Sequence, residues 1–143
     1  MKALIDTNVI LDVILHRVPF FDDAHAIFEL IEQHRFVACV SSSAMTDIFY
    51  LVRREVKDIK IVYSALDKLS SIFTIAPVLE TTIKNALSLR WKDFEDAVQY
   101  VTAQENKIDC IITRNAADFE LSAVACITPA DFLSRFATDH QYY

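Results

Sequence analysis

The sequence predicts a three-layer α/β/α domain built on a mostly parallel sheet of roughly five strands. Short, continuously apolar runs alternate with amphipathic helical patterns along the chain. Such runs are typical of strands that helices cover on both faces. The chain has 143 residues, 53% of them hydrophobic, which favours one domain with one core. We expect this domain to span residues 1–136, followed by a polar tail at residues 137–143.

The apolar runs give the expected strands. They lie at residues 3–5, 36–40, 72–75, 109–112 and 125–127. Pro77 stops the third run, because proline cannot donate to a strand ladder. Asp6 ends the first run at once, which is too early for a signal peptide.

Helical periodicity fills the segments between these runs. Helices are expected at about residues 20–33, from the serines 41–43 to about 54, and at 58–70, 79–88 and 94–105. The serines offer N-caps for the second of these helices. A last short helix should begin at Pro129 with Thr128 as its cap.

Composition excludes several kinds of site. The chain has no glycine, so it cannot form a Walker A loop, a dinucleotide-binding G-x-G-x-x-G turn or a G-x-S-x-G elbow. Its three cysteines form no C-x-x-C pair and are expected to be small buried hydrophobes. No apolar run reaches the roughly 20 residues that cross a bilayer. We therefore expect a cytoplasmic protein without membrane contact.

The net charge of −6 argues against a protein that coats nucleic acid through general basicity. If the chain handles RNA, it needs metal ions or a local basic strip. The candidate cations for such a strip are Arg53, Arg54, Lys57, Arg90, Lys92 and Arg114.

Polar residues follow the predicted strands where ligand sites of parallel sheets lie, at the carboxyl ends of the strands. Asp6 ends the first strand and Ser41–Ser43 the second. Thr113–Asn115 ends the fourth, with Asp118 just beyond. A charge at the mouth of a sheet is costly without a partner, although aspartate at a strand end is also a common turn former.

Three further acids come from predicted helices. Asp93 and Asp96 share a face with Tyr100 at the start of the helix at residues 94–105, where acids also simply complement the helix dipole or form its cap. Asp47 lies at the margin of the apolar stripe of the helix that follows the serines.

Carboxylates that converge at one sheet edge repel each other, and a divalent ion relieves this repulsion. Oxygen-only ligands favour Mg²⁺ or Mn²⁺ over zinc. Such ions activate water against phosphorus, so the pattern indicates metal-assisted phosphodiester hydrolysis. The sites expected to carry it are Asp6, Asp47, Asp96 and Asp118, with Asp93 as a further metal ligand.

In order along the chain, four segments resemble the PIN-domain family of ribonucleases. They are Leu4-Ile5-Asp6-Thr7-Asn8-Val9-Ile10-Leu11-Asp12, Ser41-Ser42-Ser43-Ala44 with the helix through Tyr50, Asp93-Phe94-Glu95-Asp96-Ala97, and Ile111-Ile112-Thr113-Arg114-Asn115-Ala116-Ala117-Asp118-Phe119. The resemblance implies that Asp6, Asp96 and Asp118 bind metal.

The same resemblance implies roles for further residues and partners. Thr7, Asn8, Thr113 and Asn115 match polar residues that orient the ligands. Many bacterial members are toxins of toxin–antitoxin pairs, and the resemblance therefore implies a small antitoxin partner and a homodimer. The family carries Glu where this chain has Asp47, and aspartate is shorter by one methylene.

Three other functions remain open. A catalytically degenerate PIN fold would bind RNA or a protein without cleaving anything. An aspartyl-phosphate phosphatase also begins with a strand-end Asp, but Asn8 stands where its acid/base Asp is needed. A phospho-receiver domain requires a lysine after its last core strand, and the run at residues 125–127 offers none.

Overall fold

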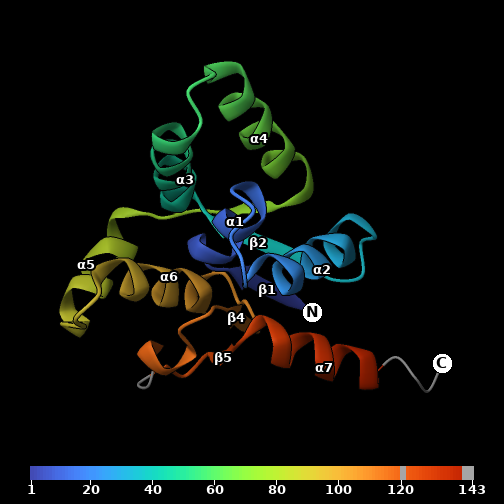
Figure 1. Cartoon of the computed structure of the whole chain (residues 1–143). Helices are drawn as coiled ribbons and strands as arrows, with labels where there is room; N and C mark the ends of the chain where they lie inside the picture. The colour runs from blue at the N-terminus through green and yellow to red at the C-terminus, as the bar shows by residue number, and fades with distance from the viewer. Residues whose placement is uncertain (120–121, 140–143) are drawn as a thin grey trace.

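The computed structural model describes residues 1–119 and 122–139, and a five-stranded sheet forms its centre (Figure 1). Its strands are β1 (Lys2–Ile5), β2 (Val37–Ser41), β3 (Thr74–Ala76), β4 (Cys110–Ile112) and β5 (Ala125–Ile127). They follow the order β3-β2-β1-β4-β5, and every neighbouring pair is parallel. The predicted α/β/α class with a parallel sheet is confirmed.

Seven α-helices and one short 3₁₀ helix surround the sheet in the described residues. They are α1 (Thr7–Ile14), α2 (Phe21–Glu32), α3 (Ser42–Glu55), α4 (Ile59–Ile72), α5 (Glu80–Leu89), α6 (Phe94–Glu105), η1 (Ala116–Phe119) and α7 (Pro129–Asp139). None of these helices is long and apolar enough to cross a membrane.

Alternate residues of the strands supply two separate cores. Ala3 and Ile5 of β1 pack with α1, α2, α3, α4 and α7, whereas Leu4 packs with α5 and α6. This period of two follows from the pleat of a strand. Both faces of β1 are therefore buried, which explains why its sequence is continuously apolar.

Helix α1 was not predicted. It buries Val9, Ile10 and Leu11, and with them the polar Thr7 and Asp12. Because it is buried around most of its circumference, it shows no polar stripe, and its apolar residues continue those of β1 without a break. The helical period was therefore hidden.

Other boundaries differ by small shifts. Helix α4 continues to Ile72, so β3 begins at Thr74 rather than at residue 72. Helix α7 runs to Asp139, beyond the residue 137 at which the tail was expected to begin. The rest of that tail, residues 140–143, lies outside the described residues. The hydroxyl of Thr128 accepts a hydrogen bond from the Asp131 amide at 3.2 Å, as its predicted capping role requires.

Strand order brings the site residues together. The chain passes from β1 to β2 on one side and returns to β4 on the other, so the order reverses beside β1. Ile5 of β1 pairs with Ile112 of β4, and this register places Asp6 next to Thr113. The crevice at such a switch point is where parallel α/β sheets bind ligands.

Candidate active site

Asp6 is the central residue of the site. It leaves β1 in an extended conformation and caps α1, but its side chain makes no bond to that helix. Its amide donates to the Ile112 carbonyl at 3.0 Å, which joins it to β4. Only 4% of the residue is exposed, so its charge depends on the groups around it.

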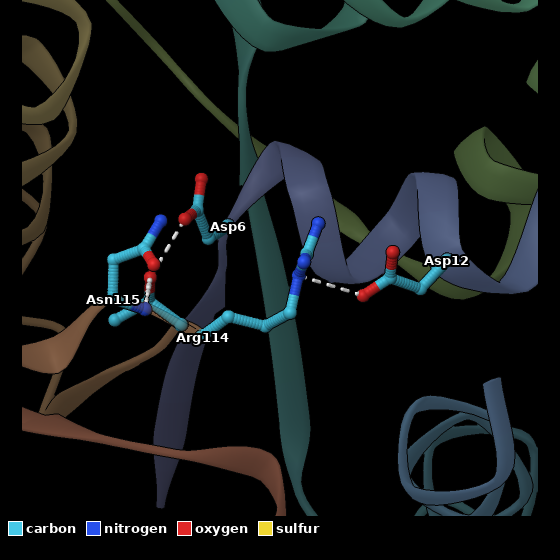
Figure 2. A network of polar contacts seen from close by, with 5 residues as sticks. Asp6, Asp12, Arg114 and Asn115 are labelled. Atoms are coloured by element: carbon cyan, nitrogen blue, oxygen red, sulfur yellow. Dashed lines mark hydrogen bonds and ion pairs between the residues drawn. The ribbon is translucent and has the colours of Figure 1, made fainter. Parts of the chain in front are cut away.

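Two side chains hold the Asp6 carboxylate. Gln99 Nε2 donates to Oδ1 at 2.9 Å, and Thr113 Oγ1 donates to Oδ2 at 2.7 Å. Thr113 in turn accepts the Asn115 amide at 3.1 Å (Figure 2). Asp6 is thus oriented from α6 on one side and from the loop after β4 on the other. The positions expected for Thr113 and Asn115, close to Asp6, agree with this network.

Asp96 lies in the first turn of α6 and is half-buried. Loss of solvent is the main cause that raises the pKa of its carboxyl to about 7. Repulsion from neighbouring carboxylates adds to this rise in pKa, and these neighbours are Asp93, Asp6, Glu95 and Asp118. Asp96 therefore lies within electrostatic reach of four other carboxylates, those of Asp93, Asp6, Glu95 and Asp118.

Glu95 joins the same group. Thr7 Oγ1 donates to its Oε1 at 3.0 Å. Burial raises the pKa of Glu95, Thr7 lowers it, and the charges of Asp6, Asp47 and Asp93 raise it further. Thr7 thus contacts the acidic group through Glu95.

Asp93 and Asp118 line the opening of the site. Asp93 is the N-cap of α6, since its Oδ1 accepts the Asp96 amide at 3.1 Å. Asp118 lies exposed in η1. Together with Asp96 and residues 89–92 of the turn between α5 and α6, they line a cavity of about 620 Å³.

Asp47 and Asn8 are the remaining predicted residues of the site. Asp47 is exposed on α3, and its charge reaches the group by raising the pKa of Glu95. Asn8 is half-buried in the first turn of α1.

Two of the arginines predicted to contact RNA have partners within the chain. Arg114 Nε lies 3.0 Å from Asp12 Oδ2 (Figure 2). The guanidinium of Arg114 also lies over the Phe20 ring, 3.9 Å from its centre. Arg53 donates to the Val56 and Lys57 carbonyls at the end of α3. RNA contact by Arg53 and Arg114 stays a prediction, and each guanidinium has a partner within the chain.

Sequence reasoning missed Gln99, Glu95 and Asp12. Gln99 is only 2% exposed, and it follows Asp96 by three residues, which places both on one side of α6. A buried amide at that spacing was a usable signal. Asp12 gave none, because its partner Arg114 is more than a hundred residues away.

The carboxylates of the site suit a hard divalent cation that is bound partly by the protein and partly by water or substrate. Within residues 1–119 and 122–139, no three His, Cys, Asp or Glu side chains cluster tightly enough to hold a metal by themselves. Mg²⁺ is ordinarily bound by one or two carboxylates together with water and substrate phosphate. Burial and repulsion between these carboxylates both raise the pKa of Asp96. Such a group of oxygen donors suits a cation that water and substrate also bind.

Comparisons with known proteins agree with this geometry. The family model of the PIN domain matches residues 2–117. The chain is 25% identical over 142 residues to a protein named ribonuclease VapC1 from Aquifex aeolicus, and the match covers 96% of both chains.

Two solved structures share the fold. One is VapBC2 from Rickettsia felis bound to a DNA fragment from its promoter, with a TM-score of 0.68, 18% identity and coverage of 90% of this chain and 98% of that one. The other is a toxin–antitoxin complex from Klebsiella pneumoniae, with a TM-score of 0.65, 23% identity and coverage of 89% and 97%.

Proposed function

This chain belongs to the PIN-domain family, and from that premise we propose that it is a metal-dependent ribonuclease and the toxin of a toxin–antitoxin pair. One observation carries the proposal. Two hydrogen bonds orient the Asp6 carboxylate, and its charge contributes to the raised pKa of Asp96. The relative named ribonuclease VapC1, which aligns over almost the whole chain, supports the same activity.

In this proposal Asp6 and Asp96 hold Mg²⁺ or Mn²⁺, with Asp93 and Asp118 at the open side. A divalent ion there supplies an activated water at neutral pH and offsets the charge of the phosphate. Gln99 and Thr113 fix the direction of the Asp6 oxygens. Asp93 fixes the first turn of α6 and hence the position of Asp96. These hydrogen bonds orient the Asp6 and Asp96 carboxylates before the substrate binds.

The partners follow from the same premise. A small antitoxin would hold the toxin inactive, as suggested by structural neighbours described as VapBC2 and as a toxin–antitoxin complex. The toxin itself would be a homodimer in the cytoplasm. RNA is the substrate class, as suggested by the relative named ribonuclease VapC1.

The test compares Asp6→Asn and Asp96→Asn with the wild type. Both variants should lose RNA cleavage in Mn²⁺ while the circular dichroism spectrum stays unchanged. Asp67→Asn is the matched control, because Asp67 is an exposed acid on α4. Wild-type cleavage rates in both site variants would refute the assignment of these ligands.

The second candidate function is a degenerate PIN fold that binds RNA or protein without cleavage. Asp47, which stands where the family carries Glu, favours it, since the structure leaves Asp47 exposed on α3. A wild-type protein that binds RNA but does not cleave it in Mg²⁺ or Mn²⁺ would decide for this alternative.

A further inference from the structure

The turn between α5 and α6 lines the same cavity as the acidic site. Residues 89–92 and the three acids Asp93, Asp96 and Asp118 all line this 620 Å³ space. Its size lies within the roughly 300–1,000 Å³ of ordinary ligand sites. Two of the lining residues of the turn are cations, Arg90 and Lys92.

These two cations are not neutralised by the acids beside them. Both are exposed, and in the described part of the chain neither forms a salt bridge, although the same cavity holds three carboxylates. The protein carries a net charge of −6. Two cations without a salt bridge in the described residues, in the cavity that also holds Asp93, Asp96 and Asp118, therefore leave positive charge available to an anionic ligand.

An aromatic cluster fixes the turn against the rest of the site. Trp91 stacks on Tyr100 of α6 with ring centres 5.0 Å apart, and its edge meets Phe119 at 5.9 Å. Tyr100 follows Asp96 by one helical turn, and Phe119 follows Asp118 directly. Trp91 thus packs the cation-bearing turn against α6 and η1, which carry Asp96 and Asp118, and this packing preorganises the cavity.

We propose that Arg90 and Lys92 bind a phosphodiester of the RNA strand next to the one that is cleaved, and that Trp91 positions them. This inference rests on the proposed ribonuclease function. An RNA strand brings a negative charge at every nucleotide toward a group of carboxylates. A metal offsets the charge of the phosphate at the centre, whereas the neighbouring phosphates need cations of their own.

A simpler role for Arg90 is to end α5, because its backbone is left-handed with φ of 54°. Lys107 provides the control for this role. It has φ of 52°, is exposed, and follows the other end of α6, which lies roughly 18 Å from the first turn. The two residues share conformation and charge, but only Arg90 lines the cavity.

The first measurement is RNA binding in an Asp6→Asn background, where no turnover occurs. A short fluorescein-labelled oligoribonucleotide of mixed sequence is titrated in Mg²⁺ at several salt concentrations. Arg90→Ala with Lys92→Ala should weaken binding about tenfold or more. The slope of log affinity against log salt should become shallower by about 0.7, because one phosphate of a single strand loses its cations. Lys107→Ala should change neither quantity. Equal behaviour of the double variant and this control would overturn the subsite.

The second measurement uses Trp91, the only tryptophan of the chain. In the Asp6→Asn protein, saturating oligoribonucleotide should change its fluorescence emission, and an unchanged spectrum would place RNA elsewhere. Trp91→Ala should weaken RNA binding, and Trp91→Phe should restore it because a ring still packs on Tyr100. Equal losses in both variants would remove the positioning role.

Cleavage by the wild type separates this inference from the proposed function. If the wild type does not cleave RNA but binds it through Arg90 and Lys92, the subsite stands and the nuclease falls. If the double alanine variant cleaves with unchanged kcat/KM, the subsite falls and the nuclease stands. A wild type that binds no RNA would overturn the subsite whatever the cleavage assay gives.

Discussion

Gln99 donates its side-chain amide to Oδ1 of Asp6 at 2.9 Å, and both residues are almost completely buried. The bond joins α6 to the end of β1 across 93 positions of sequence. Because Thr113 holds the other oxygen, the carboxylate has one orientation in the fold. Its geometry therefore depends on two neutral donors that belong to neither β1 nor α1.

Gln99→Leu should consequently lower both stability and metal affinity. The substitution leaves a buried carboxylate oxygen without its donor, which costs about 1–3 kcal/mol. Thermal melts with and without Mn²⁺ measure both effects, because a bound ion stabilises by about 2.7 kcal/mol at a hundredfold excess over its dissociation constant. Gln104→Leu is the control on the exposed face of the same helix. A metal-induced shift of normal size in Gln99→Leu would show that this amide does not orient the ligand.

The ion pair of Asp12 and Arg114 makes a second prediction. Asp12 is 1% exposed, and its oxygens have no hydrogen-bond partner in the described residues although Arg114 Nε lies 3.0 Å away. Burial raises the pKa of Asp12, and Arg114 opposes that rise. The pair is thus held mainly by charge, with Arg114 also stacked on Phe20.

Arg114→Met should destabilise the protein by roughly 3 kcal/mol, because it leaves the buried charge of Asp12 without its partner. Asp12→Leu combined with Arg114→Met should recover much of that loss, since no charge is then left buried. Urea denaturation of the two single variants and the double variant measures the coupling. Additive losses would mean that the two side chains act independently. RNA binding by folded Arg114→Met should keep its salt slope, because this cation has its partner inside the fold.

The pKa of Asp96 predicts how stability depends on pH without metal. In the folded protein this pKa rises from 3.8 to about 7, so the native state keeps a proton that the unfolded state has lost. Stability should therefore fall as pH rises from about 4 to about 7. Asp96→Asn should flatten this fall and raise Tm at pH 7 in EDTA. Mn²⁺ should also raise Tm at pH 7, because it offsets the charges that the fold disfavours. A profile that is equally steep in Asp96→Asn would assign the slope to other groups.

Sequence periodicity was sufficient for the sheet, because strands buried on both faces and helices with one apolar stripe leave distinct patterns. It also placed Asp6 near Thr113, since carboxyl ends of adjacent parallel strands share one edge. Helix α1 escaped because it is buried on nearly all sides. The partners of Asp6 and Asp12 were not predicted for a different reason. A hydrogen bond between Gln99 and Asp6 depends on the rotation of α6 about its axis over the sheet, and no local sequence pattern indicates that rotation.

Asp47 gives the last prediction, and it decides between enzyme and binder. It is exposed on α3, yet its charge helps to raise the pKa of Glu95, so it lies within electrostatic reach of the site. The family's Glu is longer by one C–C bond, about 1.5 Å. A direct ligand must lie within a few tenths of an ångström of its ideal distance, whereas water can bridge a gap of one bond length, since Mg²⁺ retains water ligands.

If Asp47 acts through such a water, Asp47→Asn loses most of the RNA cleavage, Asp47→Ala loses at least as much, and Asp47→Glu stays active or gains. Glu55→Gln, an exposed acid in the last turn of the same helix, should leave cleavage unchanged. Single-turnover cleavage in Mn²⁺ measures all four variants. If only Asp47→Glu cleaves and the wild type does not, the natural chain is an attenuated nuclease whose α3 carboxylate is too short. If the three Asp47 variants all cleave like the wild type, Asp47 is an ordinary solvated charge, and its effect on Glu95 is electrostatic background without a role in catalysis.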